Sequence, residues 1–162
     1  GNLPYNISSQ ILTNFINYSY SEFSYKKLIL MFQKEVADRI LAEENSKNYG
    51  RLSIFSSWKL NIKKIMDISP SSFFPKPKVM SSLLIFEPKI NYIKFKNSKN
   101  LEHITNVFFN QRRKMIKKPL NILFTNSKEV VNELDLDINL RPQNLKKDTF
   151  YKICLNYEKL IN

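Results

Sequence analysis

The chain has 162 residues, of which 43% are hydrophobic and 25% are charged, and this balance excludes an intrinsically disordered chain. No apolar run approaches the ~20 residues of a membrane-spanning helix, and the single cysteine, Cys154, excludes an internal disulfide and favours a reducing compartment. The net charge of +12 favours a polyanionic partner.

The first half of the chain alternates between two kinds of pattern. Residues 8–18 have the apolar spacing of a helix, for which Ser8 is the expected N-cap. The apolar run at residues 28–32 (LILMF) predicts a central strand that is buried on both faces. Helical spacing returns at residues 34–42 and again at 51–60.

Two further strands are predicted at residues 62–68 and 82–86. The segment between them, SPSSFFPKPKV at residues 69–79, contains three prolines and predicts a stiff, extended loop. Strands that alternate with helices and end in two directly joined strands predict the fold class α/β. We expect the later half of a mostly parallel sheet with an antiparallel edge hairpin.

Beyond residue 88 the predicted structure is helical. Helices are expected at residues 101–109, 128–134 and 149–160, and Pro119 must start a new helix or kink an old one. Residues 1–88 carry a net charge of +4, and the remainder carries +8. The expected division is residues 1–88 for the α/β part, 89–100 for a linker and 101–162 for a small all-α domain.

The tetrapeptide Asn2-Leu3-Pro4-Tyr5 has the groups that methylation of an adenine amine requires. The amine lone pair is delocalised into the ring, and acceptors that take both N–H groups favour its attack on a methyl donor. The Asn2 side chain and the Leu3 carbonyl offer such acceptors, while Tyr5 offers a ring that can stack on a flipped base. The alternative is an ordinary strand-to-helix turn, in which Asn and Pro are common.

Five blocks of sequence, in this order, resemble the KsgA-type small-subunit ribosomal RNA adenine dimethyltransferases. They are GNLPYNIS (1–8), QKEVADRI (33–40), YGRLS (49–53), SFFPKPKVMSS (72–82) and FNQRRK (109–114). The resemblance implies an S-adenosylmethionine-dependent enzyme with a Rossmann-like catalytic domain and a helical C-terminal domain. It implies N6,N6-dimethylation of two adjacent adenosines in the 3′-terminal hairpin of small-subunit rRNA, on the immature small ribosomal subunit in the cytoplasm.

The same resemblance implies roles for individual residues. Asn2 and Leu3 match the pair that binds the amine, and Asn2 also lies beside the methyl end of the cofactor. Tyr5 and Phe73 match the two rings that hold the base. Phe74 departs from the family pattern, because a small or polar residue is expected there.

The family's glycine-rich cofactor loop has no counterpart in this sequence, whose only glycines are Gly1 and Gly50. We therefore expect these residues by themselves to be inactive in methyl transfer. We also expect the incomplete sheet to expose an edge that favours self-association.

A basic tract is the best candidate for RNA docking, because five cations in seven residues can contact RNA phosphates. The tract consists of Arg112, Arg113, Lys114, Lys117 and Lys118. The alternative for this tract is a solvated face. His103 and Cys154 are weak catalytic candidates, and no cysteine and histidine cluster predicts a metal site.

Two other functions stay open at this point. One is a non-catalytic RNA-binding or ribosome-assembly module, which the missing cofactor loop favours. The other is a large-subunit rRNA adenine methyltransferase of the antibiotic-resistance type.

Overall fold

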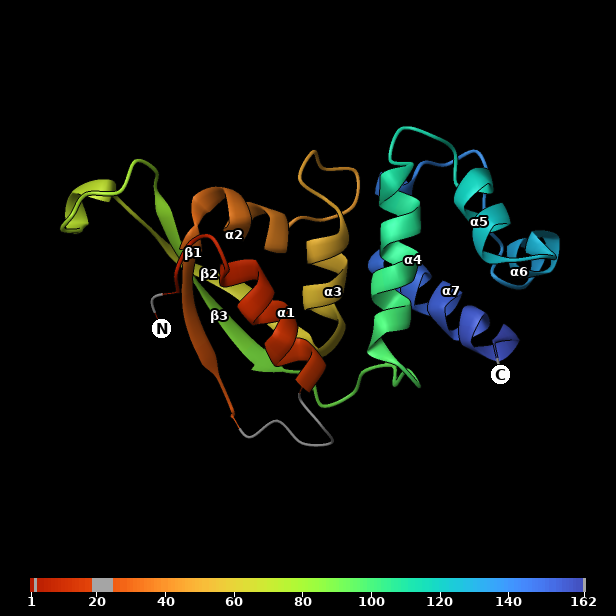
Figure 1. Cartoon of the computed structure of the whole chain (residues 1–162), viewed down its shortest axis with the longest axis horizontal. Helices are drawn as coiled ribbons and strands as arrows, with labels where there is room; N and C mark the ends of the chain where they lie inside the picture. The colour runs from red at the N-terminus through yellow and green to blue at the C-terminus, as the bar shows by residue number, and fades with distance from the viewer. Residues whose placement is uncertain (2, 19–24, 162) are drawn as a thin grey trace.

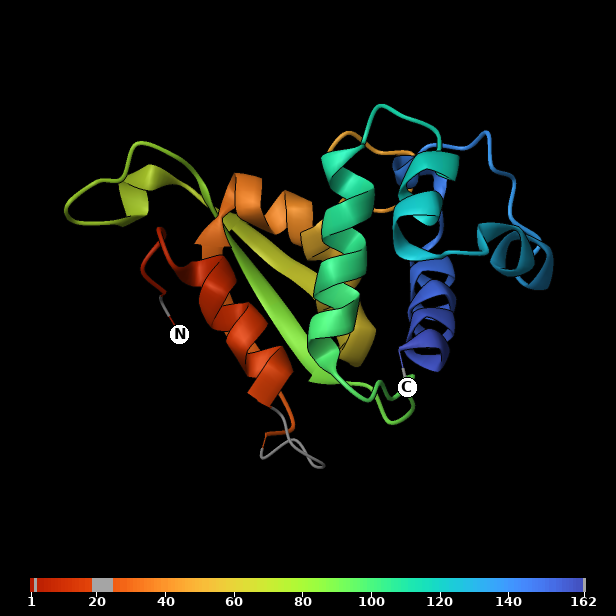
Figure 2. The ribbon, with the colours of Figure 1, turned by 45° about the vertical axis from the view of Figure 1, so that its right-hand side comes forward.

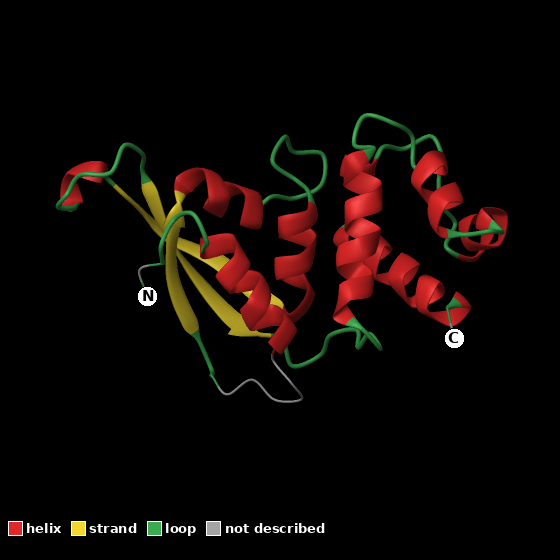
Figure 3. Ribbon diagram, in the orientation of Figure 1, coloured by secondary structure: helices red, strands yellow, loops and turns green. Residues whose placement is uncertain are grey.

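The computed structural model describes residues 1, 3–18 and 25–161 of the chain. Three strands form one sheet: β1 (Leu28–Gln33), β2 (Leu60–Ile68) and β3 (Ser81–Pro88). Helices account for most of the remaining secondary structure (Figures 1 and 3). The α/β class predicted from the sequence is confirmed.

The strand order is β1-β3-β2, and both outer strands pair antiparallel with β3. The prediction that residues 28–32 form the central strand is therefore wrong for the described sheet, because β3 returns between β1 and β2. The predicted antiparallel hairpin of the last two strands is confirmed, whereas the mostly parallel pairing that we expected is not found among the three described strands, because β3 runs antiparallel to both neighbours. Full burial of β1 on both faces is also wrong, since Ile29 is 43% exposed on one face while Leu30 is buried on the other.

Helices α1 (Ser8–Tyr18), α2 (Lys34–Ile40) and α3 (Arg51–Lys59) lie on one side of the sheet (Figures 1 and 2). Leu12 and Ile16 of α1 are completely buried, as the helical spacing predicted. Ser8 is the first helical residue rather than the N-cap, and its hydroxyl donates a hydrogen bond to the Tyr5 carbonyl over 3.2 Å.

The segment expected to be a linker is packed against the core. The indole N–H of Trp58 donates a hydrogen bond to the Ile93 carbonyl over 2.7 Å, and the Phe95 ring centroid lies 4.8 Å from that of Trp58. Helix α4 (Ser98–Asn110) begins inside the predicted linker, because the Asn97 side chain caps it by accepting from Lys99 N.

Four helices follow β3: α4, α5 (Lys117–Leu123), α6 (Ser127–Glu133) and α7 (Lys147–Leu160). The helix predicted at residues 101–109 is confirmed within α4, where Leu101, Ile104 and Phe108 follow helical spacing and are completely buried. Pro119 lies in the first turn of α5, where its missing N–H costs no helical hydrogen bond. Sequence spacing did not predict α5, which has only seven residues.

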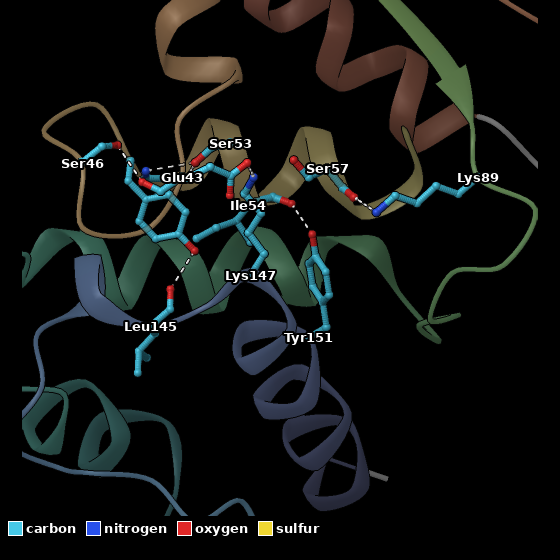
Figure 4. Close-up of polar contacts among 11 residues, drawn as sticks. Glu43, Ser46, Ser53, Ile54, Ser57, Lys89, Leu145, Lys147 and Tyr151 are labelled. Carbon is cyan, nitrogen blue, oxygen red and sulfur yellow. Dashed lines mark hydrogen bonds and ion pairs between the residues drawn. The ribbon is translucent and has the colours of Figure 1, made fainter. Parts of the chain in front are cut away.

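Reciprocal contacts join the helices after β3 to the α/β part (Figure 4). The Tyr151 hydroxyl donates to the Ile54 carbonyl over 2.7 Å, and the Tyr49 hydroxyl donates to the Leu145 carbonyl over 2.8 Å. Burial raises the pKa of both phenols well above the usual range, so both stay protonated donors. The division into separate domains stays a prediction.

Candidate functional site

The turn before α1 has one backbone carbonyl without a hydrogen-bond partner among the described residues. Ile7 N donates to the Pro4 carbonyl over 3.2 Å, and the Tyr5 carbonyl accepts from Ser8. By contrast, the Leu3 carbonyl accepts no hydrogen bond from any described residue. Asn2, the other predicted amine acceptor, lies outside the described residues.

The β2–β3 loop runs past this turn and contains one short 3-10 helix, η1 (Pro70–Ser72). Its base is held by hydrogen bonds. The Tyr5 hydroxyl lies 2.6 Å from the Ser81 hydroxyl, and the Ser82 hydroxyl donates to Asp67 over 2.6 Å. Both serines are completely buried, so the first two residues of β3 fix the loop and the turn relative to each other.

The Asp67 carboxylate also strengthens this anchor electrostatically. Hydrogen bonds from Ser82 and from the Lys64 ammonium, 3.0 Å away, lower the pKa of Asp67 below its usual value. Asp67 is therefore ionised at neutral pH and remains an acceptor for Ser82.

A cavity of about 420 Å³ lies between the turn and the loop. It is lined by Leu3, Pro4, Tyr5, Phe73, Phe74, Pro75 and Pro77. We call it the aromatic pocket. Three of the predicted site residues, Leu3, Tyr5 and Phe73, thus lie together although 68 residues separate Tyr5 from Phe73 in the chain. Three rings and no charged side chain make this pocket suited to a flat, neutral, aromatic ligand.

A second hollow, of about 680 Å³, lies on the helical part. We call it the basic groove, and its lining is Arg113, Lys114, Met115, Lys117, Lys118, Asn121, Ile122, Asn139 and Arg141. None of its five cations forms an ion pair with a described carboxylate. Five unpaired cations suit a polyanion. Sequence reasoning missed Arg141, because only the tertiary fold brings it to the tract.

Arg112, the first residue of the predicted tract, has a different environment. Its guanidinium donates hydrogen bonds to the Lys47 carbonyl and to the Gln143 side chain, the latter over 3.4 Å. Arg112 therefore ties the end of α4 to the loop before α3 and is absent from the groove lining.

Neither of the two weak catalytic candidates, His103 and Cys154, lies in a surrounding that favours catalysis. His103 is exposed on α4, with its ring 5.8 Å from that of Tyr157. Cys154 is completely buried, and burial raises the pKa of its thiol, which disfavours the reactive thiolate. Within the described ranges, no group of three or more His, Cys, Asp or Glu side chains could hold a metal ion. No helix in these ranges is both long and apolar enough to cross a membrane.

Comparison with known proteins shows to which family the sequence belongs. A family model described as "Ribosomal RNA adenine dimethylase" matches residues 1–159. The chain belongs to the ribosomal RNA adenine dimethylase family. The motif resemblance is thereby confirmed.

Relatives of this dimethylase family chain are named Ribosomal RNA small subunit methyltransferase A. The protein from Pelagibacter ubique is 60% identical over 160 residues, which are 99% of this chain and 61% of the relative. The protein from Prochlorococcus marinus is 41% identical over 167 residues, covering 98% of this chain and 60% of the relative. The chain thus spans about three-fifths of the length of these relatives.

Solved structures show the same fold. A dimethyladenosine transferase from Plasmodium falciparum is 29% identical, with a TM-score of 0.82 over 98% of this chain and 65% of that chain. The 23S rRNA methyltransferase ErmE is 14% identical, with a TM-score of 0.63 over 98% of this chain and 64% of that chain, and shares the fold alone.

Proposed function

We propose that this chain belongs to an S-adenosylmethionine-dependent enzyme that dimethylates two adjacent adenosines in the 3′-terminal hairpin of small-subunit rRNA. The observation that carries the proposal is the aromatic pocket, a cavity without charged side chains that Leu3, Tyr5 and Phe73 line together. The relatives named as small-subunit methyltransferases support the substrate class.

The pocket residues divide the work on one flipped adenine. Tyr5 and Phe73 stack on the base and hold it flat. The Leu3 carbonyl, which no described residue occupies, accepts one amine N–H, and the Asn2 side chain accepts the other. These acceptors favour the tetrahedral amine whose lone pair attacks the methyl group, so they act mainly in the transition state.

S-adenosylmethionine, when bound, supplies the electrophilic methyl group. The residues of this chain fit only the end of the cofactor beside the base, where Asn2 would contact it. The two glycines, Gly1 and Gly50, cannot build a glycine-rich cradle for the rest. We therefore propose that residues outside these 162 hold the remainder of the cofactor.

Backbone hydrogen bonds of Gly1 support a Rossmann-like sheet. Gly1 N donates to the Ile29 carbonyl, and Met31 N donates to the Gly1 carbonyl over 3.0 Å. Bonds to the residues on both sides of Leu30 follow the parallel ladder pattern. We infer that the turn at Leu3–Tyr5 leaves a strand that runs parallel to β1, as in doubly wound sheets that bind ligands at their carboxyl ends.

The basic groove would dock the RNA backbone of the immature small subunit. Its cations supply phosphate contacts, which position the RNA without reading its sequence. A cytoplasmic location follows from this partner. The predicted contribution of Arg112 to phosphate binding is the least supported, because its guanidinium is engaged within the protein.

The two alternative functions have less support. A non-catalytic RNA-binding module gives no role to the three-ring pocket or to the Leu3 carbonyl, which accepts no hydrogen bond from a described residue. A large-subunit methyltransferase is supported only by the shared fold of ErmE, at 14% identity.

The test is single-turnover methylation of the rRNA hairpin by the complete protein that contains this chain. Replacing Asn2 by Ala should slow methyl transfer by ~10²–10³, as for the loss of one preorganised transition-state contact, with little change in RNA affinity. Asn6→Ala is the matched control, because Asn6 is an exposed neighbour on the same turn. A loss below about tenfold for Asn2→Ala would contradict the assigned role.

A further inference from the structure

Phe74 has a side chain with no structural explanation inside the fold. It is 103% exposed, and no described ring lies against it. Single exposed apolar side chains are common on protein surfaces, so exposure alone carries no conclusion. The position of Phe74 is what distinguishes it, because it lines the aromatic pocket together with its neighbour Phe73 and with Tyr5.

The surroundings of Phe74 match a platform for a single-stranded base. The exposed Lys76 and Lys78 follow it on the same loop, and no acidic residue occurs between Asp67 and Glu87. Neither lysine has an ion-pair partner among the described residues. An exposed ring beside unpaired cations is the combination that binds single strands by stacking and phosphate attraction.

The loop is also stiff enough to present the ring. Pro75 and Pro77 fix two backbone φ angles immediately after Phe74, and the Ser81 and Ser82 hydrogen bonds anchor the loop at β3. A loop whose backbone is held in this way loses little backbone entropy when a base stacks on the ring that it carries.

Resting on the proposed function, we propose that Phe74 stacks on the nucleobase immediately next to the adenine in the pocket. When one adenine flips out of the helix, the adjacent base loses the ring on which it stacked. The exposed ring of Phe74 takes the place of that adenine. Phe74 is therefore a positioning residue for the nucleotide adjacent to the target, distinct from Tyr5 and Phe73, which hold the target itself.

A double-mutant cycle with the complete protein that contains this chain tests this assignment. The RNA is a hairpin with one target adenosine, together with two versions in which the nucleotide on its 5′ or 3′ side is abasic. Phe74→Leu should weaken binding of the intact hairpin roughly tenfold and should cost nothing on one of the two abasic hairpins. Tyr5→Leu, the control, should weaken binding of all three hairpins.

Three outcomes would overturn the proposal while the proposed function stands. They are unchanged affinity of Phe74→Leu for the intact hairpin, a loss that persists on both abasic hairpins, and concentration-dependent self-association that Phe74→Leu abolishes. The last would make a second copy of the chain the occupant. If the unsubstituted complete protein neither bound nor methylated the intact hairpin, the proposed function itself would fail, an outcome separate from these three. Unchanged thermal unfolding of Phe74→Leu verifies the fold.

Discussion

The aromatic pocket and the basic groove are opposite in chemistry. The pocket presents three rings and no charged side chain, whereas the groove presents five cations and no ring. A ring discriminates by shape and stacking, while a solvated cation attracts any phosphate at a distance. Under the proposed function, selection of the base and attachment to RNA therefore belong to separate surfaces. The β2–β3 loop, which lines the pocket, and α5, which lines the groove, lie at opposite ends of the molecule (Figures 1 and 2).

The largest expected effect comes from removing charge from the groove. The triple variant Arg113→Gln, Lys114→Gln, Lys117→Gln should flatten the log–log salt dependence of RNA binding by about two units. At about 0.15 M salt this corresponds to an affinity loss of roughly fiftyfold, because each lost phosphate contact no longer releases counterions. A salt series of binding curves on the rRNA hairpin and a scrambled hairpin measures both slope and preference.

Arg112→Gln is the matched control for this triple variant. Its guanidinium is hydrogen-bonded within the protein, so its loss should lower the unfolding temperature and leave the salt slope nearly unchanged. An unchanged slope in the triple variant would make the groove a solvated face. A loss confined to the true hairpin would show that the groove reads bases or shape.

Removing a ring from the pocket should have a more selective effect. Tyr5→Ala or Phe73→Ala should each weaken capture of the flipped base by about 1–3 kcal/mol. The salt slope should stay the same, since no phosphate contact is lost. Fluorescence of 2-aminopurine at the target position, followed during titration, measures capture directly. If both variants gave the same titration curve as the wild type, the aromatic pocket would have no role in recognising the base.

The junction between the sheet and α4, which separates the two surfaces, can be tested at Glu158. This buried carboxylate accepts hydrogen bonds from Lys96 N, Asn97 N and the Asn100 amide, where the chain passes from the sheet into α4. Burial alone would raise the pKa of Glu158, but these donors outweigh it and lower the pKa. We expect Glu158→Gln to reduce the free energy of unfolding by about 1–3 kcal/mol at pH 7.

The pH dependence of Glu158 follows from the sign of its shift. A lowered folded pKa means that its stabilisation is complete above the unfolded value of about 4.3 and is lost as pH falls through the folded value. Urea unfolding at several pH values should show this loss in the wild type and not in Glu158→Gln. Glu44→Gln is the control, since Glu44 has no hydrogen bond or ion pair among the described residues. Equal acid sensitivity of all three proteins would contradict the assignment.

The smallest expected effect is that of Tyr5→Phe, which keeps the ring and loses the hydrogen bond to Ser81. Stability should fall by about 0.5–1.5 kcal/mol, the usual net value of one hydrogen bond. Base capture should remain close to wild type. A loss as large as that of Tyr5→Ala would mean that the hydroxyl, rather than the ring, does the recognition.

Local patterns predicted the elements whose burial repeats with helical spacing. Helix α4 is the clearest case, because Leu101, Ile104 and Phe108 form one stripe. The strand order was not predictable in this way, since a run such as LILMF shows burial but not which neighbour pairs with it. Residue 101 was predicted as a domain start because the lysines of the preceding segment conceal the packed Phe95.

The site was predicted only where its members lie close together in the chain or match a family motif. Leu3, Tyr5 and Phe73 followed from motifs, and the structure brings them to one pocket. Arg141 and Ser81 could not be found from spacing, because their contacts depend on tertiary packing. Arg112 and Arg113 are adjacent in sequence, yet one is engaged inside the protein and the other lines the groove.

The two tyrosine hydroxyl contacts, Tyr49 to Leu145 and Tyr151 to Ile54, have a consequence for the substrate. They hold the helices after β3 at a fixed distance from the sheet, and therefore hold the basic groove at a fixed distance from the aromatic pocket. Under the proposed function, an RNA would gain the avidity of both surfaces only when its phosphates and its flipped adenine are separated by that distance. We therefore expect a hairpin with the adenine at another distance to engage one surface at a time and to bind more weakly.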